Sequence, residues 1–358
     1  MAGSSGSAGT MAGNGGMAGA AAGTGGTAGA AAGTGGAGGA MAGNGGTAGA
    51  AAGTGGTAGG AGGAGAVCNG AAALCERPYN QVAVACTHNA MSSSVYGFVA
   101  PIPNQKRSFT QQLDDGVRCL MLDTYAYMGD LYLCHGSCGV WGAMPMKKGL
   151  DEIAAWMTAH PTDVVTFILE AYISEADTLK ALAASGLSSA DGLADPTRPL
   201  YVHAKPPGSP WPTLGEMIAK NQRLVVFTDD GKANGKWHLD WRAYGWETPY
   251  DDPTWSCAVN RGDPTLHDNQ VFVLNHFDTG PIGADEATAT AANAYPLLLD
   301  HAARCWTKDA KLNPFAQIPT FVTVDHYHAP TAGGPSPRAD VFDVVDALNA
   351  AWPTPLPP

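Results

Sequence analysis

The sequence predicts an α/β protein built as an eight-stranded (β/α)8 barrel of the TIM type. Short apolar runs rich in β-branched residues recur along the chain, and segments with helical spacing separate most of them. Strands that are apolar throughout and alternate with helices are typical of a parallel sheet covered on both faces. Eight such runs favour a closed barrel over an open sheet. The runs lie at residues 82–86, 117–122, 131–134, 164–169, 200–202, 224–227, 271–274 and 320–324.

The segments between the runs supply the expected helices. The second and third runs, 117–122 and 131–134, are too close together for a helix to connect them, so we expect an imperfect barrel. Helical spacing occurs at 149–160, 175–185, 214–221, 287–305 and 339–350.

The first 65 residues differ in composition from the rest of the chain. The sequence "TAGAAAGTGG" occurs at 27–36 and again at 47–56, and no charged or aromatic residue precedes Val67. Such a segment buries too little apolar surface to offset the entropy lost on ordering. We therefore predict a disordered Gly/Ala/Thr-rich tether at 1–65 and a barrel domain at 66–358; the ten-residue period leaves a packed polyglycine-type array as the alternative.

All of the formal charge lies in the predicted barrel domain. There are 31 acidic and 19 basic residues, which give a net charge of −12. This excess argues against nucleic acid as a partner and against electrostatic capture by an anionic membrane. It suits a site that requires a cation. No apolar run approaches the roughly 20 residues that a transmembrane helix needs.

The chain contains eight cysteines. Cys134 with Cys138, and Cys68 with Cys75, are close enough in sequence to form small disulfide loops. A zinc site at Cys134, His135 and Cys138 is the alternative, although a second ligand pair of comparable spacing is missing. Disulfides together with a low-complexity tether favour an extracellular or cell-surface protein, even though no basic, Leu-rich leader opens the sequence.

Polar side chains follow the predicted strands. Barrel enzymes place their chemistry at the C-terminal ends of the strands, so we expect these side chains to face one common opening. They are His88, Asn89, Asp123, His135, Glu170, Lys205, Asp229, Asn275, Asp325 and Tyr327.

The residue types in this ring suit phosphodiester cleavage. A neutral histidine can accept a proton from an attacking hydroxyl while a protonated one donates to the leaving oxygen, and His88 and His135 supply such a pair. Asn89, Asp123 and Glu170 offer hard oxygen ligands, which suit Ca²⁺ better than zinc. The cation would stabilise charge on the phosphoryl oxygens.

Six motifs in one order carry a family resemblance from about residue 80 to 330. They are "THNAMSS", "QQLDDGVRCLMLDTY", "GDLYLCHG", "DVVTFILEAY", "WPTLGEMIAKNQRLVVFT" and "IPTFVTVDHY". Together they resemble the phosphatidylinositol-specific phospholipase C X-domain superfamily. The similarity is greatest to its plant, fungal and bacterial branch of secreted or surface-attached phosphodiesterases.

The resemblance implies a role for each matching position. His88 matches the general base that activates the inositol 2-hydroxyl, and His135 matches the general acid for the leaving alcohol. Asn89, Asp123 and Glu170 match ligands of the calcium-dependent members. The chain therefore resembles the metal-dependent type.

The pattern departs from the family in two respects. Met121 occupies the position where animal members supply a further carboxylate ligand. No clear counterpart exists for the basic residues that hold extra inositol phosphates; Lys205 is either a phosphate contact or a surface lysine. Asp325 either orients His88 or accepts a hydrogen bond at the barrel rim, and Tyr327 is a candidate substrate contact.

We expect a phospholipase C-type phosphodiesterase, assisted by Ca²⁺, that acts on an inositol phospholipid or a related phosphodiester. The alternatives are a noncatalytic surface or binding module on the same barrel, and a glycerophosphodiester hydrolase. The aromatic segment 237–255 either contacts lipid through its four Trp, in a peripheral membrane contact, or folds over the opening as a lid.

Overall fold

The computed structural model describes residues 67–99, 103–229, 231, 233–278, 285–328 and 333–357. The predicted tether at 1–65 lies outside these residues and stays a prediction.

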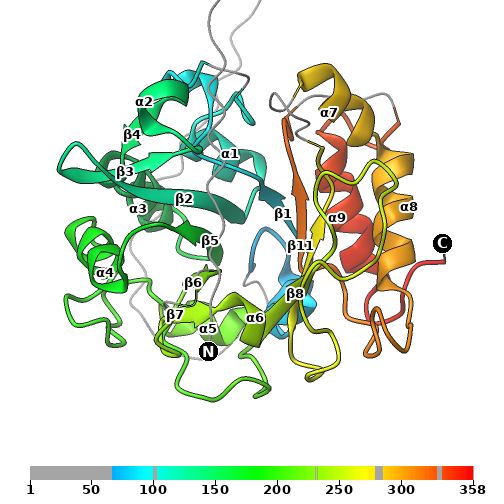
Figure 1. Cartoon of the computed structure of the whole chain (residues 1–358). Coiled ribbons are helices and arrows are strands. Elements are labelled where there is room, and N and C mark those ends of the chain that lie inside the picture. Colours follow the sequence, from blue (N-terminus) through cyan, green and yellow to red (C-terminus); the bar gives the residue numbers. More distant parts are fainter. Residues whose placement is uncertain are drawn as a thin grey trace, which may run out of the picture. The chain divides into compact units, whose positions relative to one another are not determined.

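Eight parallel strands form the wall of a barrel (Figure 1). Hydrogen bonds join them in the order β7-β6-β5-β2-β1-β11-β10-β8. Within the described residues no ladder joins β7 to β8, so the barrel is open at that point, and the predicted imperfect (β/α)8 barrel is confirmed. The strands are β1 (Val84–Thr87), β2 (Cys119–Tyr127), β5 (Val165–Ala171), β6 (Leu224–Thr228), β7 (His238–Asp240), β8 (Gly245–Glu247), β10 (Val271–Asn275) and β11 (Phe321–Val324).

The third predicted strand is not part of the barrel wall. It forms β3 (Asp130–Cys134), which pairs antiparallel with β2 and with β4 (Ala143–Pro145). Only Met128 and Gly129 separate β2 from β3, and both have positive φ, 51° and 85°. A two-residue turn of this kind closes a hairpin and is far too short for a parallel crossover.

The fifth predicted strand, 200–202, is reduced to one bridge. Leu200 pairs with Leu224 at the start of β6, and the amide of Tyr201 donates to the Leu224 carbonyl at 2.8 Å. Farther along the same edge of β6, β7 takes over, with His238 opposite Val226. The wall is therefore completed by β7 and β8, two strands that the sequence analysis did not predict.

These two strands lie in the segment that was expected to contact lipid or act as a lid. Trp237, Trp241 and Trp246 are all at most 2% exposed. Trp255 is half-buried and stacks on His276. The Trp side chains therefore pack in the wall and its surroundings, so both predictions for 237–255 are wrong for residues 237–247.

Helices cover the outside of the barrel. Figure 1 shows α8 and α9 side by side next to β1 and β11, and α9 contacts both strands. The predicted helix at 287–305 is two helices, because the chain turns at Asn293 and Pro296 opens the second. The helices are α1 (Phe109–Asp115), α2 (Cys138–Trp141), α3 (Met146–Ala159), α4 (Glu175–Ala184), α5 (Leu214–Ala219), α6 (Trp241–Tyr244), α7 (Glu286–Ala292), α8 (Tyr295–Trp306) and α9 (Asp340–Ala351). The remaining short elements are β9 (Arg261–Gly262) and the 3-10 turns η1 (Ala72–Leu74), η2 (Tyr79–Gln81) and η3 (Ser94–Tyr96).

Strand alternation divides the buried side chains into two cores. On β2, Leu120 and Leu122 point outward and pack with the helices, whereas Cys119 and Met121 point into the barrel. Asp123 continues the inward series. The alternation therefore fixes which side chains of a strand reach the open end of the barrel interior.

The eight cysteines form four disulfides. Cys68–Cys75 and Cys134–Cys138 are those predicted; Cys86–Cys119 and Cys257–Cys305 complete the set. Because Cys134 and Cys138 are bonded to each other, neither offers a thiolate, and the alternative zinc site is excluded in this oxidised form.

Two buried histidines are hydrogen-bonded to each other beside β10, and burial favours their neutral forms. The ring of His276 donates from Nε2 to the Ala292 carbonyl at 2.9 Å, so its Nδ1 accepts from Nδ1 of His301 at 2.8 Å. Burial lowers the pKa of His276 to about 4 and that of His301 to about 2.

We predict that this pair makes the fold acid-sensitive. Between pH 6.5 and 4 the unfolded chain binds protons that the folded chain does not, so the free energy of unfolding falls as pH falls, by roughly 3 kcal/mol for His276 alone. The destabilisation that His276→Gln causes at pH 7 should therefore shrink by about that amount at pH 4 in urea unfolding. His160→Gln, at a half-exposed ring, is the control. A destabilisation that is constant across pH would contradict the prediction.

Candidate active site

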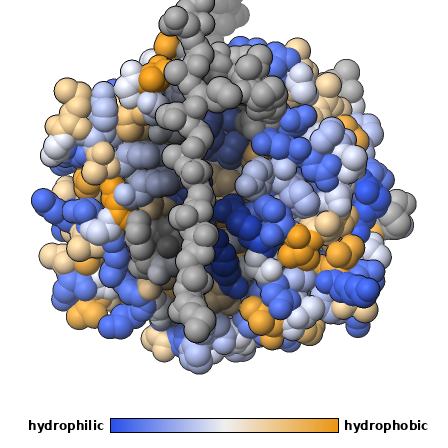
Figure 2. Space-filling model, in the orientation of Figure 1, coloured by the Kyte–Doolittle hydropathy of each residue, from blue (hydrophilic) through white to orange (hydrophobic). Residues whose placement is uncertain are grey.

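A cavity of about 180 Å³ lies at the C-terminal ends of the strands. Seven of the side chains expected at the opening line this mouth cavity, namely His88, Asn89, Asp123, His135, Glu170, Asp229 and Asn275. Figure 2 shows hydrophilic surface gathered in a hollow at the centre of the face drawn in Figure 1. The remaining residues that line the mouth cavity are Met121, Ile168, Leu169, Tyr250, Arg261 and Phe277.

His88 is held by two neighbouring strands. It directly follows β1, and its amide donates to the Val324 carbonyl at the end of β11. Asp325 directly follows β11 and is 1% exposed. Its Oδ1 lies 3.0 Å from Nδ1 of His88. Asn104 donates to the same carboxylate oxygen at 3.1 Å. A carboxylate at Nδ1 places the ring proton there and leaves Nε2 as the proton acceptor.

The other contacts of His88 fix its ring plane. Phe277 stacks on the ring with centroids 3.8 Å apart. The side-chain nitrogen of Asn89 lies 3.1 Å from Nε2. Asn89 has a φ of 45°, a left-handed conformation that Asn tolerates better than most residues, and this turn brings its side chain back to the ring.

His135 faces His88 across the mouth cavity. It follows β3, and the two ring centroids are 6.5 Å apart at an interplanar angle of 74°. Burial lowers the pKa of His135, and the proximity of His88 lowers it further, while Asp325 opposes the shift. The two histidines thus have different environments, which is the requirement for one acid and one base.

Carboxylates gather beside the two histidines. Asp123 on β2 is in register with Glu170 on β5, and Asp229 follows the next strand, β6. Burial raises the pKa of Asp123 well above its ordinary value, and the charges of Glu170 and Asp229 add to the shift. Hard oxygens that repel one another in this way, with the Asn89 amide nearby, fit a divalent cation such as Ca²⁺.

Arg261 is a site residue that the sequence analysis missed. Its Nε donates to Oε1 of the buried Glu247 at 2.6 Å and its Nη1 donates to Oδ2 of Asp229 at 2.6 Å. Burial acts to lower the pKa of Arg261, but the hydrogen bonds and charges of Glu247 and Asp229 raise it above its ordinary value. Arg261 lies on β9, which runs antiparallel to β8, so no rule about the ends of parallel strands could have found it.

Two aromatic pairs border the mouth cavity. Phe277, two residues beyond β10's Asn275, stacks on His88 and also on Tyr250 at 6.3 Å. The second pair lies two residues beyond Asp123 and Glu170, on the same face of the sheet, and consists of Tyr125 and Tyr172. Their rings stack 4.4 Å apart.

Two predicted substrate contacts lie away from the mouth cavity. Lys205 lines separate cavities with Val202 and other neighbours. Tyr327 is 1% exposed, and its hydroxyl donates to Asp115 at 2.7 Å. Because the chain after residue 202 leaves the barrel wall, and because Tyr327 points into the helix-covered core, neither side chain has the position that its predicted role requires.

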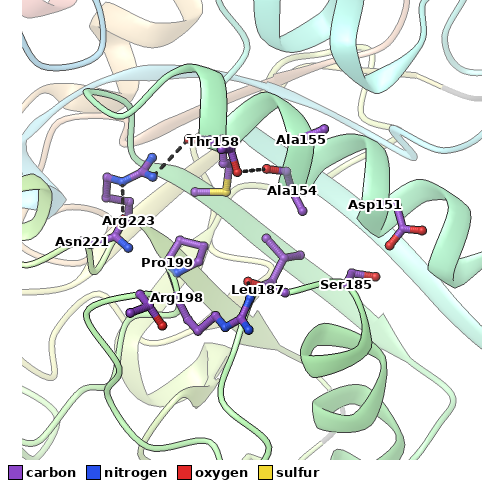
Figure 3. Close-up of a pocket in the computed structure, with 13 residues that line it drawn as sticks. Asp151, Ala154, Ala155, Thr158, Ser185, Leu187, Arg198, Pro199, Asn221 and Arg223 are labelled. Atoms are coloured by element: carbon purple, nitrogen blue, oxygen red, sulfur yellow. Dashed lines mark hydrogen bonds between the residues drawn. The ribbon is translucent and has the colours of Figure 1, made fainter. Parts of the chain in front are cut away.

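A larger cavity, of about 440 Å³, lies between α3 and the loops that precede β6 (Figure 3). Figure 3 shows Arg223 and Arg198 at its edge. The donors of Arg223 are taken by Asn221 and by three backbone carbonyls, including that of Met157. The side chains around this cavity therefore hold the fold together, and the acid–base groups lie at the mouth cavity instead.

The chain is similar in sequence to proteins of one family. The family model described as PI-PLC X 1 matches residues 74–330. A PI-PLC X domain-containing protein of Arabidopsis thaliana is 29% identical over 76% of this chain and 62% of its own length. An uncharacterized secreted protein of Arthroderma benhamiae is 28% identical over 78% of this chain and 63% of its own. The phosphatidylinositol-specific phospholipase C of Listeria monocytogenes aligns with a TM-score of 0.47 and 12% identity, over 76% of this chain and 94% of that one.

The family model covers most of the described barrel. The chain belongs to the PI-PLC X-domain family. It spans less than two thirds of the length of the Arabidopsis and Arthroderma relatives. In the described part of the chain, no helix has both the length and the apolar character needed to cross a membrane.

We predict that Arg261 stabilises the mouth cavity by neutralising Glu247. Arg261→Leu leaves the 2% exposed carboxylate of Glu247 without its charged partner, with the Asn260 side chain still donating to its Oε1. The change should cost roughly 2 to 3 kcal/mol in urea unfolding, somewhat less than for a fully buried pair because Arg261 is partly exposed. The double variant Arg261→Leu/Glu247→Gln should recover most of the loss. Equal stability of the single variant and the wild type would contradict this role.

Proposed function

We propose that the protein is a calcium-assisted phosphodiesterase of the phospholipase C type, which cleaves an inositol phospholipid or a related phosphodiester. The observation that carries the proposal is the pair of histidines across one cavity, with only His88 backed by a carboxylate. This asymmetry assigns the base to His88 and the acid to His135. The family of the chain supports the same assignment.

The reaction follows from these two assignments. Nε2 of His88 accepts the proton of a hydroxyl adjacent to the phosphodiester, and the hydroxyl oxygen forms a new bond to phosphorus. The bond between phosphorus and the leaving oxygen breaks, and His135 gives its proton to that oxygen. The products are an alcohol and a cyclic phosphate. Asp325 stabilises the imidazolium that forms on His88.

Asn89, Asp123 and Glu170 would hold the cation. The chemistry that Ca²⁺ supplies when bound is stabilisation of negative charge on the phosphoryl oxygens. Without it, a phosphodiester would meet three carboxylates and, among the described residues that line the cavity, no Lys or Arg that is free, because Arg261 is already engaged with Glu247 and Asp229. Met121, in place of a further carboxylate, leaves three protein ligands for the ion.

The lining of the mouth cavity supports a headgroup without additional phosphates. Arg261 is the only Lys or Arg among the described residues that line the cavity, and two carboxylates surround it. The exposed rings of Tyr250 and Tyr172, each stacked on a second aromatic ring, instead offer flat faces on which a polyol ring can lie. A neutral ring next to a single phosphodiester fits this arrangement better than a polyphosphorylated one.

We further propose an extracellular protein that contacts membranes peripherally. Four disulfides suit an oxidising compartment. Met128, at the tip of the β2–β3 hairpin, is 84% exposed, and Val140 on the helix after β3 is 58% exposed. These apolar side chains lie on the segment that carries His135, where contact with lipid would bring the substrate close to the mouth cavity.

We predict that residues 66–358 turn over phosphatidylinositol, that a chelator abolishes the activity, and that His88→Ala lowers kcat by at least about 100-fold. Asp325→Asn should lower it less, because the ring remains in place. Turnover that persists in chelator would remove Ca²⁺ from the proposal and leave the histidine pair. An intact fold with no turnover of any inositol lipid would favour a glycerophosphodiester substrate or a binding role, which a glycerophosphodiester assay distinguishes.

We predict a second readout that does not depend on turnover. Calorimetry should detect Ca²⁺ binding to the wild-type protein, and Asp123→Asn should weaken it at least about tenfold, since one of three ligands loses its charge. Asp151→Asn, an acidic residue on the exposed side of α3, is the matched control and should bind normally. Equal affinities for all three proteins would place the cation elsewhere.

A further inference from the structure

The histidine proposed as the general acid lies inside the smallest disulfide ring of the protein. Cys134 and Cys138 are four positions apart, and His135 is the first residue between them. Cys134 is fully buried at the end of β3 and pairs with Ala143 on β4, while its neighbour Leu133 pairs with Thr124 on β2. One end of the ring is thus fixed in the sheet.

The other end has little else to hold it. The helix α2, which begins at Cys138, has four residues and no buried side chain, and Ser137 makes no capping hydrogen bond through its side chain. Gly136 adopts the left-handed conformation, with a φ of 65°, which reverses the chain after His135. Without the disulfide, the pair Cys134–Ala143 of the β3–β4 ladder would still close this segment at its ends. Between those ends, α2 would be anchored by half-buried contacts such as that of Trp141.

The His135 ring also lacks the support that His88 has. In the described part of the chain, no carboxylate or carbonyl accepts a hydrogen bond from its imidazole, whereas His88 is tied to Asp325. The direction of the His135 ring therefore depends on its backbone. That backbone is closed into a ring by Cys134 and Cys138.

General stabilisation is the weaker explanation for this disulfide. A cross-link stabilises a fold mainly by removing entropy from the unfolded chain, and the effect grows with the length of the loop that it closes. A separation of 4 removes much less entropy than the separation of 48 between Cys257 and Cys305. So short a disulfide ring mainly restricts the backbone conformation of the residues inside it.

We propose that the Cys134–Cys138 disulfide is a positioning device that holds His135 across the mouth cavity from His88. The role of His135 as the general acid rests on the proposed function. The placement of its imidazole by the disulfide does not depend on that function. Opening the disulfide should impair proton donation to the leaving oxygen and spare the proton removal at His88.

Leaving groups of different basicity separate these two effects. The alcohol released from phosphatidylinositol needs a proton as it leaves, whereas nitrophenolate released from nitrophenyl inositol phosphate does not. For Cys134→Ala/Cys138→Ala we expect kcat on phosphatidylinositol to fall at least about 30-fold and kcat on the nitrophenyl substrate to change less than about threefold. The control is Cys68→Ala/Cys75→Ala, which removes the other short disulfide ring. That ring lies near the N-terminal end of β5, where the Asn69 amide donates to the Thr162 carbonyl. Both activities of this control should stay within about threefold of the wild type.

Two kinetic outcomes would overturn the proposal. If both substrates lose activity equally in Cys134→Ala/Cys138→Ala, the disulfide acts through the fold as a whole. If neither loses activity, other contacts hold His135.

A titration of the His135 ring by NMR gives a result even if the wild-type protein turns over neither substrate. The ring signal is assigned with His135→Gln. Opening the ring should expose the imidazole and move its pKa upward toward the ordinary value near ~6.5, while the Cys68→Ala/Cys75→Ala variant leaves it unchanged. An unchanged titration in Cys134→Ala/Cys138→Ala would refute the positioning role. If the wild type turns over neither substrate but opening the disulfide still shifts the pKa of His135, the positioning role is supported and only the proposed function is refuted.

Discussion

The parallel register of β11, β1, β2 and β5 is the constraint on which the site depends. It places His88 beside Asp325 across one strand pair and Asp123 beside Glu170 across another. Neither pair is close in sequence. A shift of one residue in any of these strands would turn the polar side chains away from the barrel interior, since successive side chains alternate between faces. The chemistry of the mouth cavity therefore follows from strand pairing.

Strand-end reasoning predicted seven of the residues that line the mouth cavity, because it needs only the hydrophobic pattern and the rule that barrel sites lie at the C-terminal ends of the strands. It failed where the chain leaves that pattern. The β2–β3 turn is too short for a crossover, and β7 and β8, which complete the wall after β6, have three residues each, too few to show a period. Arg261, on an antiparallel strand, and Phe277, beyond a strand end, became visible only through the packing of distant segments. For the same reason Lys205 and Tyr327 were assigned to the opening although their side chains lie elsewhere.

The two histidines show two ways of fixing a catalytic side chain. The ring of His88 is fixed directly, by a buried hydrogen-bonded carboxylate and a stacked Phe. His135 is fixed through its backbone, at the end of a short strand and inside a disulfide ring. The difference suits their proposed tasks, because a base gains from a carboxylate that stabilises its protonated form, whereas the same carboxylate would make an acid a poorer proton donor.

The central claim is that the mouth cavity cleaves a phosphodiester by intramolecular attack. The most direct test is a time course of the products from phosphatidylinositol by phosphorus NMR, with the wild-type protein and Ca²⁺. The account predicts that the signal of a five-membered cyclic phosphate appears first, before any acyclic monoester. A monoester that forms from the start, with no cyclic species at any time, would show direct attack by water and contradict the assignment of His88 as the base for a substrate hydroxyl.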